Sequence, residues 1–251
     1  MSVVDQGLLL AVSLLANLFS AFAGGGAGLL QLPALIFLGL PFGIALATHK
    51  VASVALGVGA TLRHLREDTL ERRFILLLLV SGVPGVILGA SLILQIPDRI
   101  AQLALGVLTM LMGIYSWLRP ALGQHYQPAH RDLRGNLLGA AGLFVIGVLN
   151  GSLTSGTGLF VTLWLVQWFG MDYKRAVAHT LVLVGLAWNG SGAVTLGMLG
   201  TIAWDWLPML LIGSLVGGYV GAHLAIRHGN RFIKRAFEVM TVLVGLKLIL
   251  G

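Results

Sequence analysis

Residues 22–50 read F-A-G-G-G-A-G-L-L-Q-L-P-A-L-I-F-L-G-L-P-F-G-I-A-L-A-T-H-K, and this stretch decides the fold. A glycine cluster at Gly24–Gly28 interrupts one apolar run, and a second apolar run ends in a Gly-Leu-Pro turn before Ala-Thr-His-Lys. Glycine adopts positive φ angles without strain and allows close approach to the backbone. We therefore expect a broken helical hairpin whose turn is the glycine cluster, followed by a longer helix over 43–62.

The second half of the chain repeats this plan about 130 residues later. The sequence G-S-L-T-S-G-T-G occupies residues 151–158, and an apolar run, a glycine at Gly170 and A-V-A-H-T ending at Thr180 follow it. Each half also carries a later pair of glycines four residues apart. Because small residues at this spacing let helices approach closely in lipid, we expect a packing role for these pairs, Gly85 and Gly89 in the first half and Gly217 and Gly221 in the second.

The composition is that of a membrane protein. Only 10% of the 251 residues are charged and 57% are hydrophobic, whereas a soluble domain carries about 25% charged residues. Many apolar segments are long enough to cross a bilayer of about 30 Å, so we predict an all-α polytopic membrane protein. The N-terminus lacks the pattern of a removable signal peptide, and the absence of cysteine excludes disulfides. The predicted helices cover 8–23, 29–40, 43–62, 73–94, 100–118, 137–149, 159–169, 176–199, 207–226 and 232–250.

Lys and Arg concentrate in four segments, namely 63–73, 119–136, 170–175 and 227–235, while the counterparts of three of them in the other half are nearly bare. Positively charged loops stay in the cytoplasm. The chain is therefore expected to form two inverted repeats, 1–118 and 137–251, joined by a cytoplasmic linker over 119–136, as in many secondary transporters. The net charge of +7 belongs to these loops, and no basic domain for nucleic acid stands apart from the spans.

Inversion requires an odd number of crossings in each half. Five crossings result if 8–23 and 29–40 both cross, and three result if they form a re-entrant hairpin. The 29–40 run is only about 18 Å long as a helix, which favours the hairpin with its glycine turn inside the membrane. The sequence leaves three and five crossings open.

Non-helical backbone at membrane depth is tolerated where protein buries it or a cavity lies beside it. Helices that start after Gly28 and Gly158 would direct unpaired N–H groups and positive dipole ends inward, which suits a small anion. The alternative interpretation is that the first cluster is only a tight helix crossing. The second copy adds the hydroxyl groups of Ser152, Thr154, Ser155 and Thr157.

Three ionisable side chains lie at the starts of predicted spans: His49 and Lys50 open the 43–62 helix, and His179 opens the 176–199 helix. His223 and Lys247 lie near span ends, where we expect them to be interfacial. Intramembrane charge is costly and usually functional, so we expect Lys50 to balance the charge of an anion, although it could also reach an interface. The two histidines are either neutral hydrogen-bonding residues or proton-coupling groups. Carboxylates fall in loops, in tails, or at Glu238 beside Lys234, which argues against a cation path. Without H-E-x-x-H, G-x-S-x-G or a P-loop, no enzyme activity, metal or cofactor is expected.

The G-G-G-A-G-L-L-Q-L-P-A-L-I-F-L-G-L-P start, the A-L-A-T-H-K-V-A-S continuation and the second-half A-V-A-H-T resemble the TauE/SafE sulfite exporter family, also called the 4-toluenesulfonate uptake permease family, over essentially the whole chain. The resemblance implies a bacterial or archaeal inner-membrane protein that moves sulfite, thiosulfate, sulfonates or related anions. The family pattern often reads G-T-N-K where this chain has A-T-H-K, so His49 replaces an asparagine. The resemblance places near the substrate path Gly24–Gly28, Gln31, Pro33, Thr48, Lys50 and Ser53, with His179, Thr180 and Asn189 opposite.

We therefore predict a carrier of a small sulfur-containing oxyanion that works by alternating access. The alternatives are an anion channel and a membrane-embedded partner subunit without transport of its own. Coupling to protons and formation of a homo-oligomer in the lipid bilayer stay open at this point. The predicted substrate-binding residues are Gly24, Gly25, Gly26, Gly28, Gln31, Thr48, His49, Lys50, Ser53, Ser152, Thr154, Ser155, Gly156, Thr157, Gly158, His179, Thr180 and Asn189.

Overall fold

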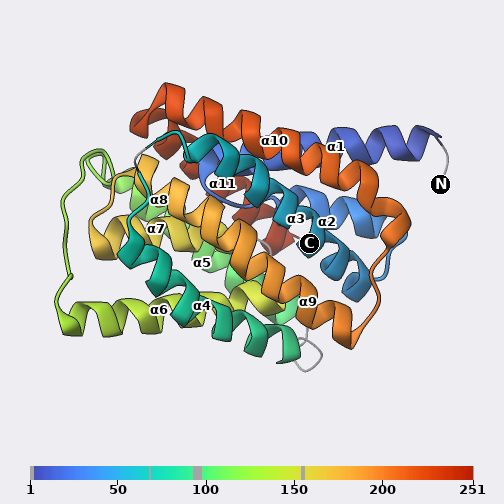
Figure 1. The fold of residues 1–251 in the computed structure, drawn as a ribbon, viewed down its shortest axis with the longest axis horizontal. Coiled ribbons are helices and arrows are strands. Elements are labelled where there is room, and N and C mark those ends of the chain that lie inside the picture. The colour runs from blue at the N-terminus through green and yellow to red at the C-terminus, as the bar shows by residue number, and fades with distance from the viewer. Residues whose placement is uncertain (1–2, 68, 93–97, 154–155, 251) are drawn as a thin grey trace.

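The computed structural model describes residues 3–67, 69–92, 98–153 and 156–250, and the regular elements in these ranges are all helical (Figure 1). The elements of the first half are α1 (Val3–Ala23), α2 (Gly28–Phe37), α3 (Phe42–His64), α4 (Arg72–Leu92) and α5 (Asp98–Leu118). Those of the second half are α6 (Leu133–Leu153), α7 (Thr157–Phe169), α8 (Tyr173–His179), the π-helical segment η2 (Thr180–Trp188), α9 (Asn189–Leu199), the 3-10 turn η3 (Trp204–Trp206), α10 (Leu207–His228) and α11 (Asn230–Leu250).

The predicted fold class is confirmed: the chain is an all-α polytopic membrane protein. Among the described residues, six helical segments are long and apolar enough to cross a membrane. Each predicted apolar range overlaps a helix, although the helix predicted over 29–40 already ends at Phe37 and residues 93–94 of the range 73–94 lie outside the described residues. The predicted helix over 176–199 differs in one respect, because its middle is the π-helical η2 between α8 and α9.

The local sequence explains where the helices start and stop. Gly24, Gly25 and Gly26 have φ angles of 88°, 139° and 102°, so the chain leaves α1 through a conformation that other residues rarely adopt. Gly170 ends α7 in the same left-handed region, with a φ of 69°. Asp172 then starts α8, because its carboxylate accepts the N–H of Arg175 at 2.8 Å.

Two helical hairpins enter the bundle from opposite ends (Figure 1). α2 doubles back along α1, since Gln31 Nε2 lies 3.0 Å from Ser13 Oγ. α7 doubles back along α6 in the same way, and the Trp164 indole donates to Gly139 O at 3.1 Å. The two glycine turns meet inside the bundle, where a Cβ atom on Gly25 would lie 2.5 Å from the carbonyl carbon of Gly158.

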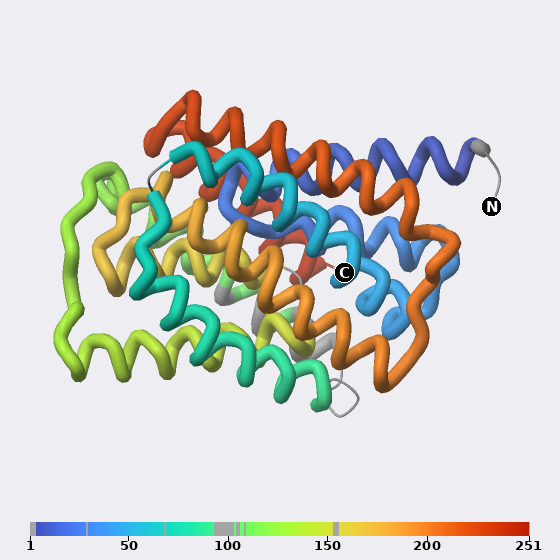
Figure 2. Tube along the Cα trace, viewed as in Figure 1, coloured from blue at the N-terminus to red at the C-terminus, as the bar shows by residue number. Residues whose placement is uncertain are grey.

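Helices of the two halves interleave, as the trace in Figure 2 shows for α1 beside α10 and α4 beside α6. The later glycine pairs lie in these two contacts. A Cβ atom on Gly217 would lie 2.5 Å from Leu14 O, and one on Gly89 would lie 2.0 Å from Val148 O. The predicted packing role of these glycines is confirmed.

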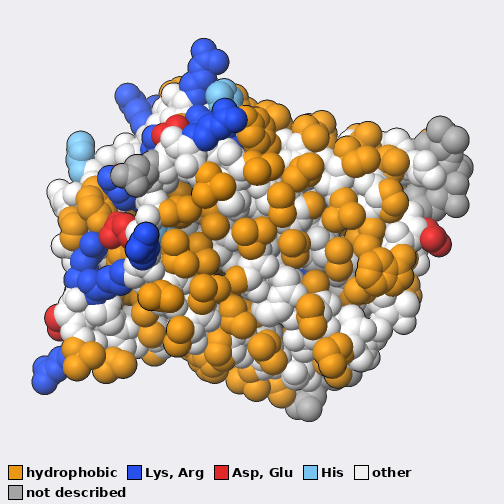
Figure 3. All heavy atoms as spheres, in the orientation of Figure 1, with side chains coloured by type: hydrophobic (Ala, Val, Ile, Leu, Met, Phe, Trp, Pro, Cys, Tyr) orange, Lys and Arg blue, Asp and Glu red, His pale blue; other side chains and the backbone are white. Residues whose placement is uncertain are grey.

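Lys and Arg gather at one end of the molecule, while hydrophobic side chains cover much of its flank (Figure 3). Hydrogen bonds join the basic segments there: Lys174 Nζ contacts Glu67 at 2.8 Å, Lys174 N donates to Asn230 Oδ1 at 2.8 Å, and Asn230 Nδ2 donates to Gln124 O at 3.0 Å. The four basic segments therefore lie together at one end, as a common cytoplasmic side would require. Inversion of the two repeats, their boundaries and the side of the membrane stay predictions.

Candidate functional site

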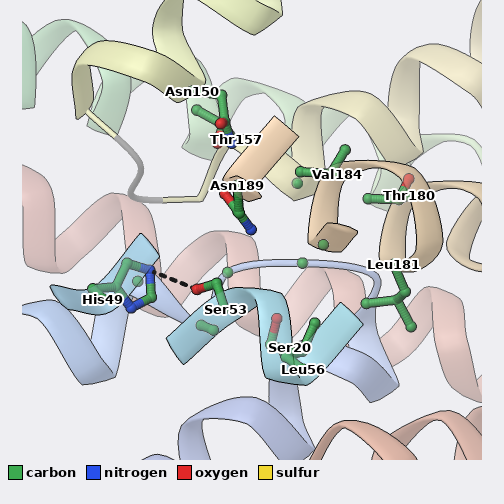
Figure 4. A pocket seen from close by; sticks show the side chains of 16 residues that line it. Ser20, His49, Ser53, Leu56, Asn150, Thr157, Thr180, Leu181, Val184 and Asn189 are labelled. Atoms are coloured by element: carbon green, nitrogen blue, oxygen red, sulfur yellow. Dashed lines mark hydrogen bonds between the residues drawn. The ribbon is translucent and has the colours of Figure 1, made fainter. Parts of the chain in front are cut away.

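The first glycine turn and the start of α7 line a small cavity of about 40 Å³ (Figure 4). Its walls come from α1, the first glycine turn, α3, α6, α7, η2 and α9. The backbone contributors include Gly25, Gly26, Ala27, Gly28 and Gly158, and the polar side chains are Ser20, His49, Ser53, Asn150, Thr157, Thr180 and Asn189.

The N-termini of α2 and α7 both face this cavity. Among the hydrogen bonds between described residues, the N–H groups of Gly26 and Ala27 have no acceptor, and both residues line the cavity. Gly28 and Gly158 line it at the first turns of the two helices. Unpaired N–H groups and aligned peptide dipoles give a helix N-terminus a partial positive charge, so the arrangement favours an anion.

Lys50 lies behind the cavity wall rather than in it. Its fully buried ammonium donates to Asn150 O at 2.7 Å, to Asn150 Oδ1 at 2.7 Å and to Asn189 Oδ1 at 3.2 Å. These three acceptors match the three donors of a lysine. In the part of the chain that the structure describes, no carboxylate forms an ion pair with Lys50, so its charge is solvated by amide oxygens alone.

Lys50 also fixes how the two asparagines face the cavity. Because each Oδ1 atom is held by the ammonium, each Nδ2 group is turned away from it. Asn150 Nδ2 donates to Thr157 Oγ1 at 2.8 Å, and Asn189 directs its nitrogen into the cavity (Figure 4). The lysine therefore orients amide donors toward the place where an anion would lie.

A chain of buried polar side chains reaches the cavity from α1 through α2 and α3. Ser13 Oγ lies 3.0 Å from Gln31 Nε2, Gln31 Oε1 lies 2.8 Å from His49 Nδ1, and His49 Nε2 lies 3.2 Å from Ser53 Oγ. Because an amide oxygen only accepts, His49 Nδ1 donates to it and Nε2 accepts from Ser53. This is the pattern of a neutral imidazole.

The structure brings nine of the predicted residues to the cavity wall. They are Gly25, Gly26, Gly28, His49, Ser53, Thr157, Gly158, Thr180 and Asn189. Gly24 supports this wall from behind, because its carbonyl accepts the hydroxyl of Thr162 at 2.7 Å. Gly156 forms the left-handed cap of α7, with a φ of 75°.

Other predicted residues lie elsewhere. Thr48 Oγ1 accepts the N–H of Ala203 at 3.0 Å, and Ser152 Oγ bonds to Val148 O of its own helix at 2.9 Å. Thr154 and Ser155 lie outside the described residues.

His179 lies at the basic end and not on the cavity wall. Its Nδ1 donates to Arg175 O at 2.8 Å, and its Nε2 accepts the N–H of Glu71 at 2.9 Å. The side chain thereby fastens the 65–71 loop to α8. Both ring nitrogens are occupied by backbone groups, which leaves none for an anion in this arrangement.

Sequence reasoning missed Asn150 and Ser20, which line the cavity. Asn150 immediately precedes the second glycine motif and is an amide at the end of an apolar run, so its place in the site could have been predicted from the sequence. Ser20 is less conspicuous, because serine is common at helix contacts in lipid.

The donor set of the site does not suit a cation. No carboxylate is present among the residues that line the cavity, and the described residues contain no group of three His, Cys, Asp or Glu side chains that could hold a metal ion. Backbone N–H groups, amide nitrogens and hydroxyls predominate, and these are donors to oxyanions.

The family model described as "Sulfite exporter TauE/SafE" matches residues 9–248. A "Probable membrane transporter protein" of Haemophilus influenzae is 29% identical over 242 residues, which cover 96% of this chain and 93% of the relative. The "Probable membrane transporter protein YfcA" of Escherichia coli K12 is 26% identical over 243 residues, covering 97% and 89%. "Probable membrane transporter protein YunE" of Bacillus subtilis is 22% identical over 265 residues, covering 96% of each chain. Since the family model spans nearly the whole chain, the resemblance read from the sequence is confirmed, and this multi-pass membrane transporter belongs to the sulfite exporter TauE/SafE family.

Proposed function

We propose that the protein is a carrier, and not an enzyme, that moves a small sulfur-containing oxyanion such as sulfite, thiosulfate or an organosulfonate across a bacterial or archaeal inner membrane. The observation that carries the proposal is the convergence of two helix N-termini on one cavity without a lining carboxylate. The sulfur class is supported by the description of the family.

The polar groups divide into two kinds of contact with the anion. Backbone N–H groups of the first glycine turn and of α7 would donate directly, together with Asn189 and the hydroxyl of Thr180. Lys50 would act from behind through Asn150 and Asn189, supplying positive charge at short range. Charge-assisted hydrogen bonds of this kind are shorter and stronger than neutral ones.

The size of the cavity supports a small substrate. Sites for drug-sized ligands enclose roughly 300–1,000 Å³, whereas this cavity measures about 40 Å³. A small oxyanion would fit after modest movement of the walls, and an organosulfonate would need a larger opening.

The two hairpins suggest how access would alternate. The α1–α2 hairpin would close the cavity toward one end of the bundle, and the α6–α7 hairpin would close it toward the other. Movement of one hairpin at a time would open the site to one side of the membrane, as in transporters with broken helices. Protons are a candidate coupling ion, with His49 as the titratable group at the cavity wall.

Thermal unfolding of the purified protein in the presence of single anions tests the site. A ligand that binds only the folded state raises the free energy of unfolding by mass action, by about 2.7 kcal/mol at a ligand concentration of 100 times Kd. The Tm rises as a result. We expect sulfite, thiosulfate or a sulfonate to raise Tm in the wild type and to have no effect on Lys50→Ala, which leaves three acceptors without their donor. Arg227→Ala, which removes an exposed cation at the end of α10, is the matched control and should respond as the wild type does.

Counterflow in proteoliposomes separates carrier from the other candidates. Saturable exchange of labelled against unlabelled anion supports the carrier, whereas flux that does not saturate would indicate a channel. Absence of both flux and thermal response to every sulfur anion would refute the proposal and favour a subunit without transport of its own. A response to carboxylates only would overturn the sulfur assignment.

A further inference from the structure

Two arginines stand one turn apart on the exposed face of α11, at the basic end of the molecule. Arg231 and Arg235 line a pocket of about 480 Å³ together with Trp117 at the end of α5. Neither guanidinium has an ion-pair partner among the described residues, whereas Lys234 between them is neutralised by Glu238 at 2.5 Å. The pocket therefore presents two unpaired positive charges about 6 Å apart along the helix.

The start of α11 is held at this end of the bundle. Asn230 accepts the N–H of Lys174 at 2.8 Å and donates to Gln124 O at 3.0 Å. Arg231 and Arg235 therefore lie within the first two turns from the basic end. Trp117 is 70% exposed beside them, as expected of an aromatic anchor at a membrane–water interface.

An apolar groove of about 660 Å³ begins at Arg235 and runs along α11 toward Lys247. Its opposite wall is the first hairpin, with Phe19 and Phe22 from α1 and Leu30 and Pro33 from α2. Twelve residues of helix separate Arg235 from Lys247, which corresponds to about 18 Å. This length slightly exceeds half of a hydrocarbon core of about 30 Å.

We propose that this surface is a binding site for an anionic phospholipid. The phosphate-bearing headgroup contacts Arg231 and Arg235, and an acyl chain lies in the groove between α11 and the first hairpin. Guanidinium groups bind phosphate oxygens through paired hydrogen bonds, and basic pockets between transmembrane helices select acidic headgroups. Arg235 lines both the pocket and the groove, so the headgroup and the acyl chain of one lipid would contact adjoining surfaces.

The charges argue against a second copy of this chain as the occupant. A two-fold contact through the α11 face would bring the unpaired arginines of both copies together, and the carboxylate that lines the pocket, Glu238, is already paired with Lys234. A zwitterionic lipid would bring its own cationic group beside the two guanidinium groups, so an anionic headgroup is the better electrostatic match for this pocket.

The test compares thermal stability in dodecyl maltoside supplemented with dioleoyl phosphatidylglycerol or dioleoyl phosphatidylcholine. We expect phosphatidylglycerol to raise Tm above the phosphatidylcholine value by about 3 °C in the wild type. Arg231→Gln/Arg235→Gln should lose this difference, and Arg231→Lys/Arg235→Lys should keep part of it. Arg227→Gln, which removes an exposed arginine that lines neither the pocket nor the groove, is the matched control and should keep all of it.

Four outcomes would overturn the assignment. They are equal stabilisation by both lipids in the wild type, an undiminished difference in the double glutamine variant, and an equal loss in Arg227→Gln. The fourth is the same stabilisation by glycerol phosphate without acyl chains. If the double glutamine variant unfolds more easily in phosphatidylcholine, native mass spectrometry of the wild type and the lysine variant decides, since co-purified phosphatidylglycerol should be bound by both. Arginine-dependent dimers without bound lipid would assign the surface to a second copy instead.

Discussion

Lys50 combines full burial with three amide-oxygen partners, and this combination sets its role at the scale of single residues. An unpaired ion in a low-dielectric interior is costly, and here the three oxygens of Asn150 and Asn189 replace water. The positive charge therefore lies next to residues of the cavity wall, and no carboxylate among the described residues neutralises it. A substrate anion in the cavity would complete the neutralisation of this buried charge.

Asn189→Asp tests this explanation, because the side chain keeps its shape and gains a negative charge. The new carboxylate would pair with Lys50 at the present 3.2 Å contact and repel an anion in the cavity. We expect the variant to be no less stable than the wild type by thermal unfolding, since it gains a buried ion pair. The Tm increase caused by sulfur anions should disappear.

Asn189→Gln serves as the comparison for Asn189→Asp. Asn189→Gln keeps the amide and should retain a reduced response, which separates charge from packing. An undiminished anion response in Asn189→Asp would show that the substrate binds away from this amide.

At the scale of elements, the close contact of the two glycine turns holds the site together. Gly25 has a φ of 139° and faces the backbone of Gly158, so Gly25→Ala introduces backbone strain and a collision at once. Gly39 also has a positive φ, 104°, but a Cβ atom there would have no heavy atom within 4 Å. We expect Gly39→Ala to cost about 1–3 kcal/mol through strain alone and to keep anion binding.

Gly25→Ala should lower Tm further than Gly39→Ala and abolish the anion response. Thermal unfolding with and without anion measures both effects on the same samples. Equal behaviour of the two variants would mean that the hairpin turns separate in the membrane and do not form one site.

The ion pairs of Glu67, between α3 and α4, make a measurable contribution to the stability of the folded protein. Glu67 bridges Arg63 at 3.1 Å and Lys174 at 2.8 Å, and the hydrogen bond from Lys174 is the main reason that the pKa of its carboxyl lies below the ordinary 4.5. A lowered folded-state pKa stabilises the protein above the unfolded value, and this stability is lost as the pH falls through the folded value. Partly exposed ion pairs of this type contribute less than about 1 kcal/mol each.

Glu67→Gln should therefore unfold at a Tm about 2–3 °C below the wild type at pH 7. This difference in Tm between the variant and the wild type should narrow as the pH falls below 4.5 and the wild-type carboxyl takes up a proton. Asp205→Asn, at an exposed carboxylate without an ion pair among the described residues, should show no gap at either pH. A gap for Glu67→Gln that is constant with pH would mean that packing, and not charge, links this loop to α8.

At the scale of the whole molecule, the shared position of the basic segments fixes which loops face the same compartment. The chain contains no cysteine, so single cysteines report their own accessibility without background. We expect His125→Cys in the linker to be protected from an impermeant maleimide in intact cells and labelled in inside-out vesicles. Thr201→Cys, in the turn between α9 and α10, should show the reverse. Labelling of both from one side would contradict the predicted topology.

Much of the architecture could be read from the sequence because its determinants are local. Apolar runs predict the helices, and the glycine clusters predict the breaks between α1 and α2 and between α6 and α7. The later pairs such as Gly217 and Gly221 predict close helix contacts, since the spacing of small residues is itself a packing signal. The side chains of Lys50 and His49 could be selected as unusual, because polar groups inside apolar runs are few.

The partners of those side chains could not be read from the sequence. Lys50 and Asn150 lie 100 positions apart in the chain, and only the hydrogen bond between them in the fold turns Lys50 from an expected direct ligand into a group that orients two asparagines. His179 follows the second motif as His49 follows the first, yet the position of the 65–71 loop carries it into a structural contact. The π-helical geometry of η2, which lines the cavity, likewise has no local signature.

The sequence by itself therefore determined the membrane class, the helices and their breaks, because each follows from composition or from neighbours along the chain, and it led us to expect an anion-binding site. Only the tertiary structure decided which residues share the cavity, since a cavity between two hairpins depends on contacts between segments more than 100 residues apart. The physical reason is that an unpaired N–H group or a buried ammonium is defined by what surrounds it in space. The order of the residues does not supply that information.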